Sequence, residues 1–248
     1  MKAGDLVRSG KLGESIQEMV AEVRDHPTDE RRRTFLFELL CFAGQYERAE
    51  KHLALLSQAG QNAELGALLY GSAISAERQR QAIFAARDYP LSVENNKASR
   101  AGTLNGKPFH SIEDLDPRIG PRLEMFVAGE YVWLPFEHIG SVRMEAPKLL
   151  RDTLWATAIV QTGPSFKGQE FGEVLLPVLS PFSWQHERDE VKLGRVTEWE
   201  QQGDGLIPYG QKLFLINDED AIPMLDIREL VFSEVPENEP ANAVSVTH

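Results

Sequence analysis

The first ninety residues carry apolar side chains at helical spacing. Between residues 16 and 23 they recur at positions i, i+3, i+4 and i+7, and residues 35–43 repeat the pattern. We expect Thr28 to cap the second of these helices, whose first turn is acidic. Further helices are predicted over residues 46–56 and, as one or two elements, over residues 64–87. None of these helices can bury its apolar face alone, so we expect them to stack on one another.

The same region contains a repeat at an offset of 34 residues, the period of tetratricopeptide (TPR) helical hairpins. The aligned pairs are Leu6 with Leu40, Gly10 with Gly44, Leu12 with Tyr46, Ser15 with Ala49 and Met19 with Leu53. A glycine lets the chain turn tightly between two helices, and a small residue lets the second helix approach closely. These pairs predict a TPR-like superhelix, although two unrelated helical hairpins could also align by chance.

From residue 90 the pattern changes. Residues 90–110 contain few apolar side chains and the turn-forming dipeptides Asn95-Asn96 and Asn105-Gly106, so they are predicted to be a linker. Short apolar runs punctuated by Gly and Pro then predict a β-rich domain over residues 111–232. The runs cover residues 131–136, 154–160, 173–178, 192–199, 212–216 and 224–232. The tail, residues 233–248, is rich in Glu, Pro, Asn and Ala and is expected to be disordered.

The predicted fold class is therefore α+β in two parts: a TPR-like α-helical superhelix over residues 1–89, followed by a mainly β C-terminal domain. Within the second part, Pro117, Gly120 and Pro121 are expected to fix a turn. In that turn Asp116 would accept hydrogen bonds from backbone N–H groups, and Arg118 would pair with an acid such as Glu124. The residues that we expect to be structural in this region are Asp116, Arg118, Gly120, Trp133, Pro135 and Trp155. The core is the favoured place for all four tryptophans, Trp133, Trp155, Trp184 and Trp199, and a surface platform is the open alternative.

Composition places the chain among ordinary globular proteins. Hydrophobic content of 42% and charged content of 26% support neither general disorder nor a membrane protein. No apolar run approaches the roughly 20 residues needed to cross a bilayer, and the start lacks the apolar core of a secretory signal. The single cysteine, Cys41, excludes an internal disulfide, which agrees with a reducing compartment. We therefore expect a cytoplasmic protein that does not bind membranes.

The charge is unevenly distributed. The net charge is −12, and residues 91–248 hold 14 Lys and Arg against 25 Asp and Glu. Such an acidic field repels phosphate backbones, so nucleic-acid binding is not expected. The one dense basic cluster is Arg31, Arg32 and Arg33. It can be interpreted as a solvated helix face or as a binding site for an acidic partner.

The sequence contains none of the common catalytic or metal-binding motifs. HExxH, CxxC, GxSxG, GxGxxG and GxxxxGK[ST] are all absent, so neither an enzyme nor a bound metal or cofactor is expected. The alternative is a small-molecule-binding or hydrolytic protein with its site at the domain junction. That site would use Asp116, Arg118, Glu137 and His138 beside Trp133.

Several blocks resemble a known family. Residues 116–124, 129–139, 150–155 and 193–199 resemble the ImpE/SciE family, also called TagJ, and residues 33–40 and 44–49 look like its helical portion. The resemblance implies a non-enzymatic adaptor of bacterial type VI secretion systems. It would bind the small sheath subunit TssB and act near ClpV, the AAA+ ATPase that disassembles contracted sheaths. The region around residues 182–186 departs from the family pattern.

Five residues are predicted to lie on a partner-binding surface. Arg31, Arg32 and Arg33 would meet an acidic helix, while Phe182 and Trp184 would act as exposed aromatic anchors. The oligomeric state is left open.

Overall fold

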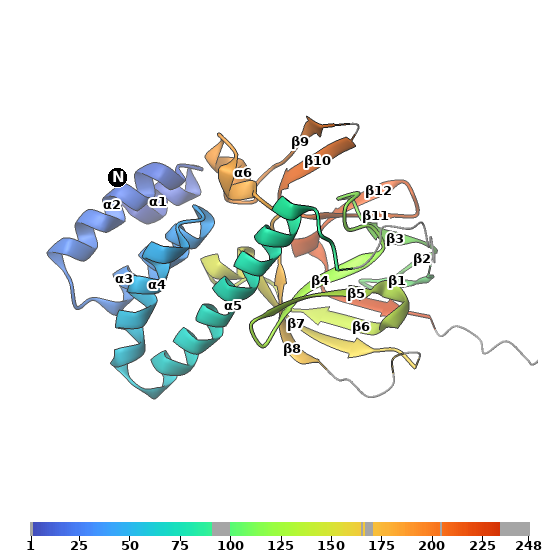
Figure 1. The fold of residues 1–248 in the computed structure, drawn as a ribbon, viewed down its shortest axis with the longest axis horizontal. Coiled ribbons are helices and arrows are strands. Elements are labelled where there is room, and N and C mark those ends of the chain that lie inside the picture. The colour runs from blue at the N-terminus through green and yellow to red at the C-terminus, as the bar shows by residue number, and fades with distance from the viewer. Residues whose placement is uncertain (1, 91–99, 165, 167–170, 204, 234–248) are drawn as a thin grey trace, which may run out of the picture.

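The structure is a computed structural model that describes residues 2–90, 100–164, 166, 171–203 and 205–233. Helices form one side of the molecule and antiparallel sheets the other, with the long helix α5 lying between them (Figure 1). The chain is thus α+β in two parts, as predicted. The expected tail, apart from Ser233, and the central part of the expected linker, residues 91–99, lie outside the described residues.

The helices of the first ninety residues follow the predicted periodicity closely, whereas a short helix near residue 190 was not predicted. Their bounds are α1 Ala3–Arg8, α2 Leu12–Asp25, α3 Glu30–Phe42, α4 Tyr46–Leu56, α5 Gln61–Ala86 and α6 Asp189–Lys192. The cap of α3 is Asp29 rather than Thr28, because the Asp29 side chain accepts a hydrogen bond from the backbone N–H of Arg32 at 3.0 Å. One continuous helix, α5, occupies the stretch that was predicted as one or two elements, and at 26 residues it is about 39 Å long.

Two glycines turn the chain between paired helices. Gly10 joins α1 to α2 and Gly44 joins α3 to α4, and both have positive φ, +76° and +65°. An L-residue with a side chain is strained in this conformation, which explains why glycine occurs at both ends of the 34-residue offset. The other aligned positions are all buried.

The described residues of the β part form three antiparallel sheets. The largest has eight strands in the order β2-β1-β13-β6-β7-β8-β4-β5, beside a three-stranded sheet β12-β11-β3 and a hairpin β10-β9. The bounds are β1 Gly102–Leu104, β2 Lys107–Phe109, β3 Ile112–Asp114, β4 Arg122–Val127, β5 Glu130–Pro135, β6 Ile139–Met144, β7 Trp155–Thr162, β8 Gly172–Pro177, β9 Thr197–Gln202, β10 Gly205–Gly210, β11 Leu213–Ile216, β12 Asp220–Pro223 and β13 Glu229–Phe232. Short 3₁₀ turns lie at η1 Ser57–Ala59, η2 Phe136–His138, η3 Leu150–Thr153, η4 Ser183–Gln185 and η5 Met224–Asp226.

Strands β5, β7, β8 and β11 lie where apolar runs predict them, but two other runs are misplaced. The run 192–199 begins at the end of α6 and only reaches β9, and the run 224–232 begins with η5 before β13. Strands β1 and β2 lie inside the segment predicted as a linker. The reason is the turn Asn105-Gly106, whose φ values of +50° and +78° form a tight hairpin of two three-residue strands.

The two parts share one hydrophobic core, which extends from Ala3 to Phe232. Helix α5 connects them: Tyr70 stacks on Trp155 of β7 with ring centroids 6.3 Å apart, and Phe84 contacts Trp133 of β5 at 6.0 Å. Trp133 and Trp155 are buried as predicted. The prediction is wrong for Trp199, which is 38% exposed on the hairpin β9–β10, because that hairpin presents one face to solvent.

Candidate functional site

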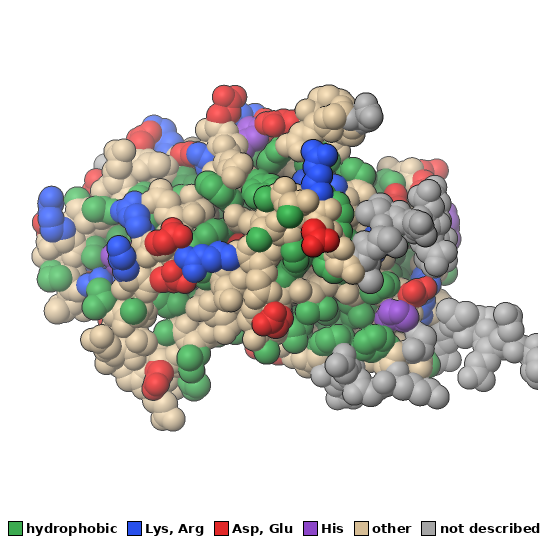
Figure 2. All heavy atoms as spheres, viewed as in Figure 1, with side chains coloured by type: hydrophobic (Ala, Val, Ile, Leu, Met, Phe, Trp, Pro, Cys, Tyr) green, Lys and Arg blue, Asp and Glu red, His purple; other side chains and the backbone are tan. Residues whose placement is uncertain are grey.

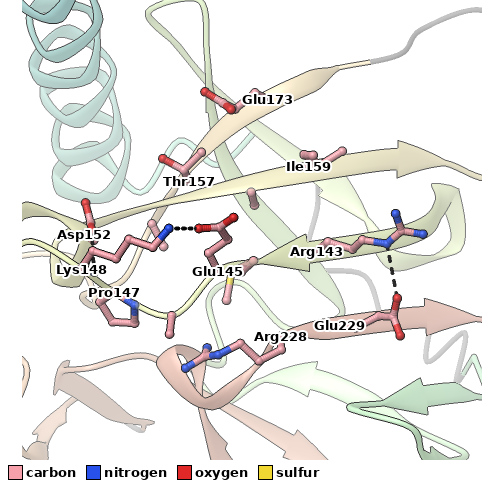
Figure 3. Close-up of a pocket in the computed structure, with 14 residues that line it drawn as sticks. Arg143, Glu145, Pro147, Lys148, Asp152, Thr157, Ile159, Glu173, Arg228 and Glu229 are labelled. Atoms are coloured by element: carbon pink, nitrogen blue, oxygen red, sulfur yellow. Dashed lines mark hydrogen bonds and ion pairs between the residues drawn. The ribbon is translucent and has the colours of Figure 1, made fainter.

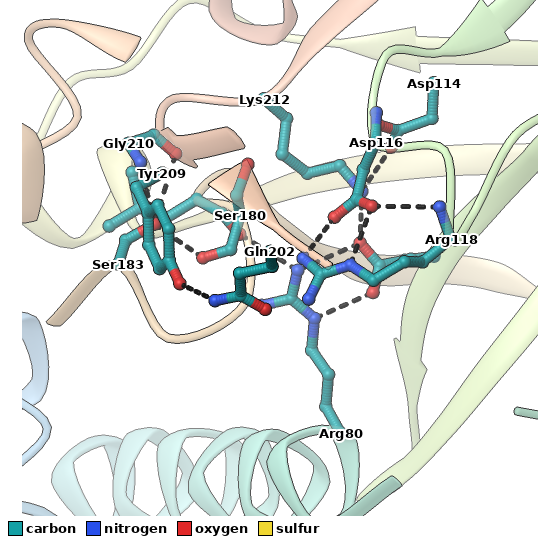
Figure 4. Close-up of polar contacts among 12 residues, drawn as sticks. Arg80, Asp114, Asp116, Arg118, Ser180, Ser183, Gln202, Tyr209, Gly210 and Lys212 are labelled. Atoms are coloured by element: carbon teal, nitrogen blue, oxygen red, sulfur yellow. Dashed lines mark hydrogen bonds and ion pairs between the residues drawn. The ribbon is translucent and has the colours of Figure 1, made fainter. Parts of the chain in front are cut away.

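A network of buried charges lies where α5 meets the sheets (Figure 4). Arg80 is its centre and is only 2% exposed. Its Nε and Nη2 donate to the two carboxylate oxygens of Glu124 on β4, at 2.8 and 2.9 Å, and Nη2 also donates to the carbonyl of Leu179 at 2.9 Å. Two parallel hydrogen bonds between a guanidinium and a carboxylate fix both distance and orientation. This pair therefore joins the helical part to the sheet at a defined position.

Other side chains complete the network around Glu124. Lys212 lies between two carboxylates, since its Nζ is 2.5 Å from Asp114 Oδ2 and also donates to Glu124. The Tyr131 hydroxyl donates to Glu124, and the indole N–H of Trp133 donates to that hydroxyl. Buried charges are costly unless they are paired and hydrogen-bonded, and here each carboxylate has a cation beside it.

The surroundings of Glu124 and Asp114 shift the pKa values of these two acids in opposite directions. Burial alone would raise the pKa of Glu124, but the positive charges of Arg80 and Lys212 outweigh it and lower that pKa to about 2. Burial raises the pKa of Asp114 to about 6, because the attraction of Lys212 only partly offsets it. Glu124 is therefore the anion that holds the network together.

The turn after β3 supports the network through local hydrogen bonds. Asp114 accepts from the backbone N–H of Asp116 at 2.8 Å, and Asp116 accepts from the backbone N–H of Arg118 at 3.0 Å. The Arg118 guanidinium pairs with Asp116 at 2.8 Å rather than with Glu124, and lies 4.8 Å from the Phe84 ring of α5. Gly120 has φ +62°, which closes the turn. Asp116 thus acts as the backbone acceptor that we expected, whereas the partner of Arg118 is different.

A second junction is formed by the segment 182–195, which covers the turns of both helical hairpins. The Trp184 ring lies against Gly44, and the Glu190 side chain lies against Gly10. Asp189 accepts from the backbone N–H of Gly13 at 2.9 Å. Arg195 donates to the carbonyl of Arg8 at 2.6 Å. This segment therefore fastens the helical part to the β part through packing and hydrogen bonds at the hairpin turns.

The predicted partner residues divide between surface and packing. Arg31 is exposed, whereas Arg32 bridges Glu22 and Asp29, and Arg33 donates to the carbonyl of Pro27. Two of the three arginines thus fasten α3 to neighbouring chain segments. Their binding role stays a prediction.

The two predicted aromatic anchors are not free on the surface. Phe182 has φ +64° and packs against the small cluster of Val191, Ile207 and Tyr209. Trp184 is only partly exposed and lies on Gly44. Both rings therefore take part in packing within the chain. Their use as anchors for a partner stays a prediction that the structure does not favour.

The residues of the alternative site are in different surroundings. Asp116 is only 1% exposed and lies in the paired network. Glu137 and His138 lie on η2, 3.6 Å from each other, with the His138 ring 5.3 Å from Phe166. Within the described residues, no group of three or more His, Cys, Asp or Glu could hold a metal ion. Asp116 is therefore buried within the turn, whereas Glu137 and His138 are partly exposed on another element.

The open hollows of the surface lie elsewhere. A hollow of about 680 Å³ on the sheet is lined by residues of β6, β7, β8 and β13 and of the segment that follows β6. Its lining includes two ion pairs, Arg143 with Glu229 and Lys148 with Glu145 (Figure 3). A smaller groove of about 210 Å³ lies between α5, the β4–β5 turn and β8. Beside it, Leu65, Leu68 and Leu69 of α5 are exposed. Periodicity could not reveal these leucines as surface residues, since they continue the apolar pattern of the helix.

Among the helices of the described ranges, none combines the length and the hydropathy that a membrane span requires.

Comparison with known proteins identifies relatives that cover most of the chain. Residues 106–231 match the family model described as ImpE protein. The chain is 31% identical to the type VI secretion system accessory component TagJ of Pseudomonas aeruginosa, across 94% of this chain and 91% of that protein. The crystal structure of protein VPA1032 from Vibrio parahaemolyticus has a TM-score of 0.82 at 21% identity, and the match covers 94% of this chain and 98% of that one. At that identity the second likeness shows the fold alone.

Proposed function

This chain belongs to the ImpE family, and we propose that it is an accessory component of a type VI secretion system that acts as a non-enzymatic adaptor. The observation that carries the proposal is the 31% identity to TagJ over 94% of the chain. The geometry agrees with it, because the charged residues around Arg80 and Lys212 are buried and paired at the junction. Those residues rigidify the molecule.

The proposed partner is the small sheath subunit, TssB, and the proposed place of action is near the ClpV ATPase. Support comes from the family resemblance and from exposed apolar side chains outside the paired network. An adaptor needs a rigid body that presents such surfaces, and the shared core with its buried ion pairs supplies one. We place this action in the cytoplasm, where contracted sheaths would be accessible.

The helical part is proposed to be TPR-like. Both hairpin glycines have positive φ, and Ser15 and Ala49 are completely buried where the paired helices approach each other. Stacked hairpins of this kind form surfaces that bind peptides or helices. The segment 182–195 covers the turns of these hairpins, so a partner would approach from another side.

The proposal is tested by calorimetry with the purified full-length chain and purified TssB of the same organism. We expect a Kd on the order of micromolar, as for transient interfaces. The large sheath subunit alone is the control, and ClpV ATPase activity is measured with and without the chain. Failure to bind TssB, alone or in assembled sheath, would contradict the proposal. Deleting residues 1–89 is unsuitable, because it would remove Arg80 and leave Glu124 buried with less compensating charge.

A further inference from the structure

The N-terminal half of α5 has an apolar face that the sheet does not cover. Towards its C-terminal half the helix packs on β5, where Gln79 donates to the carbonyl of Gly129 at 3.0 Å and accepts from the N–H of Tyr131 at 3.3 Å. The helix continues N-terminally beyond this contact. There Leu65, Leu68 and Leu69 are 59%, 64% and 44% exposed.

These three leucines have the spacing i, i+3 and i+4, so they lie on one side of the helix as a ridge. Beside the ridge is the groove of about 210 Å³, which the following apolar residues line from helix and strands: Leu68, Leu69, Ala73, Phe126, Val174 and Leu175. A ridge with an adjoining groove offers knobs and a hole to a second helix. From Leu65 to Ala73 the surface extends about 12 Å, a little more than two helical turns.

The rim of this surface is acidic. Glu64 lies on the ridge helix, Glu130 begins β5, and Glu173 lines the groove. Within the described parts of the chain none of these three carboxylates forms an ion pair, unlike Glu50 of α4, which pairs with Arg78 at 2.8 Å. Figure 2 shows acidic side chains next to hydrophobic ones at this end of α5.

We propose that this surface binds an amphipathic helix of a partner protein, whose apolar stripe packs on the leucine ridge and whose flanking Lys or Arg residues face the three glutamates. A helix is favoured because the ridge and groove run alongside α5 and match the length of two turns. A second copy of this chain is disfavoured, because a two-fold contact would bring the acidic rim against itself. The inference goes beyond the proposed function, since it holds whichever protein supplies the helix.

The test uses two synthetic 14-residue helical peptides with leucines along one face. One carries lysines on its flanks and the other carries glutamates at the same positions. Binding to the full-length chain is measured by fluorescence anisotropy at low salt. We expect the lysine peptide to bind and the glutamate peptide to bind at least about tenfold more weakly. No binding of the lysine peptide would overturn the proposal. A lysine peptide with a central proline that binds equally well would exclude a helical occupant.

Variants locate the surface. The double substitution Leu68→Asp and Leu69→Asp is expected to weaken the lysine peptide at least about tenfold, as loss of two central apolar contacts does. Leu206→Asp is the matched control, because Leu206 is 54% exposed on β10, at the opposite side of the molecule in Figure 1. Equal binding by both variants would overturn the assignment. Glu130→Lys with Glu173→Lys keeps the leucines and should reverse the preference between the two peptides.

The same variants separate this inference from the proposed function. If TssB binds the wild-type chain and the double leucine variant equally, the adaptor function stands and this surface is wrong for that partner. Arg31→Glu in the same assay tests the basic cluster instead. If TssB does not bind at all, the peptides still decide whether the surface accepts a basic helix. Self-association in sedimentation that the double leucine variant abolishes would identify a second copy as the occupant and overturn the proposal.

Discussion

The indole of Trp184 occupies the space in which a side chain at Gly44 would lie. A Cβ at position 44 would come 2.6 Å from Cε3 of the ring and 2.7 Å from Cγ, much closer than carbon atoms approach. Gly44 is also the turn between α3 and α4, with φ +65°. One glycine therefore serves both the helical hairpin and its contact with the segment 182–195.

We expect Gly44→Ala to destabilise the protein more than a matched glycine substitution. The positive φ alone costs an L-residue roughly 1–2 kcal/mol, and displacement of Trp184 adds to that cost. The control is Gly172→Ala, which has φ +64° and no atom within 4 Å of the added Cβ. Urea unfolding of both variants measures the difference. Equal losses of unfolding free energy would show that Trp184 can move aside without cost.

The buried pair of Arg80 and Glu124 should be far more important for stability than a surface pair on the same helix. Arg80→Met leaves Glu124 and Glu77 buried with less compensating charge, so we expect a loss of about 3–5 kcal/mol. The control is Arg78→Met, since Arg78 pairs with Glu50 at 2.8 Å but is 40% exposed, and its loss should stay below about 1 kcal/mol. Similar unfolding free energies for the two variants would contradict the assigned role of the network.

Titration of Glu124 and titration of Asp114 should change the unfolding free energy in opposite directions as pH rises. The pKa of Glu124 is lowered from 4.5 to about 2, so its contribution is complete above pH 4.5 and is lost as pH falls towards 2. The pKa of Asp114 is raised from 3.8 to about 6, so the folded state binds more protons and stability falls as pH rises from about 4 to 6. For Asp114, this difference between the unfolded-state and folded-state pKa corresponds to roughly 3 kcal/mol of unfolding free energy.

Asp114→Asn should therefore remove the decline in unfolding free energy between pH 4 and 6 and leave the loss below pH 4.5 in place. Urea titrations at several pH values measure both windows. The neighbouring substitution Glu113→Gln is the control, because Glu113 lies on the same strand and is partly exposed. If Asp114→Asn keeps the full slope between pH 4 and 6, another group causes it.

The helices and several strands could be predicted because their signals are local. Apolar residues at helical spacing predicted the bounds of α2, α3 and α4 within a few residues, and β5 and β7 follow continuous apolar runs. The hairpin β1–β2 was missed although Asn105-Gly106 is a strong turn signal, because its strands are too short to show alternation. Local pattern thus fails where elements are short.

The charge network could not be predicted in the same way. Arg80 and Glu124 are 44 positions apart, and a lone arginine or glutamate in a sequence is most often solvated. A weaker signal was present: Arg80 continues the stripe of Ala73, Ala76 and Phe84 on α5, so a charge lay within a buried helix face. Such an interruption indicates a buried partner but does not identify it.

Cys41 offers a probe of how firmly the helical part is held. It is the single cysteine of the chain and lies buried on α3, where burial, with nearby acids such as Glu38, raises the pKa of its thiol well above the ordinary value. Reaction with a thiol reagent at pH 8 should therefore be at least about a hundredfold slower than that of free cysteine, since it requires opening of the structure. Gly44→Ala and Arg80→Met should accelerate it, while Gly172→Ala and Arg78→Met should affect it much less. Fast labelling of the wild-type chain in native buffer would show that α3 is not held by the contacts described above.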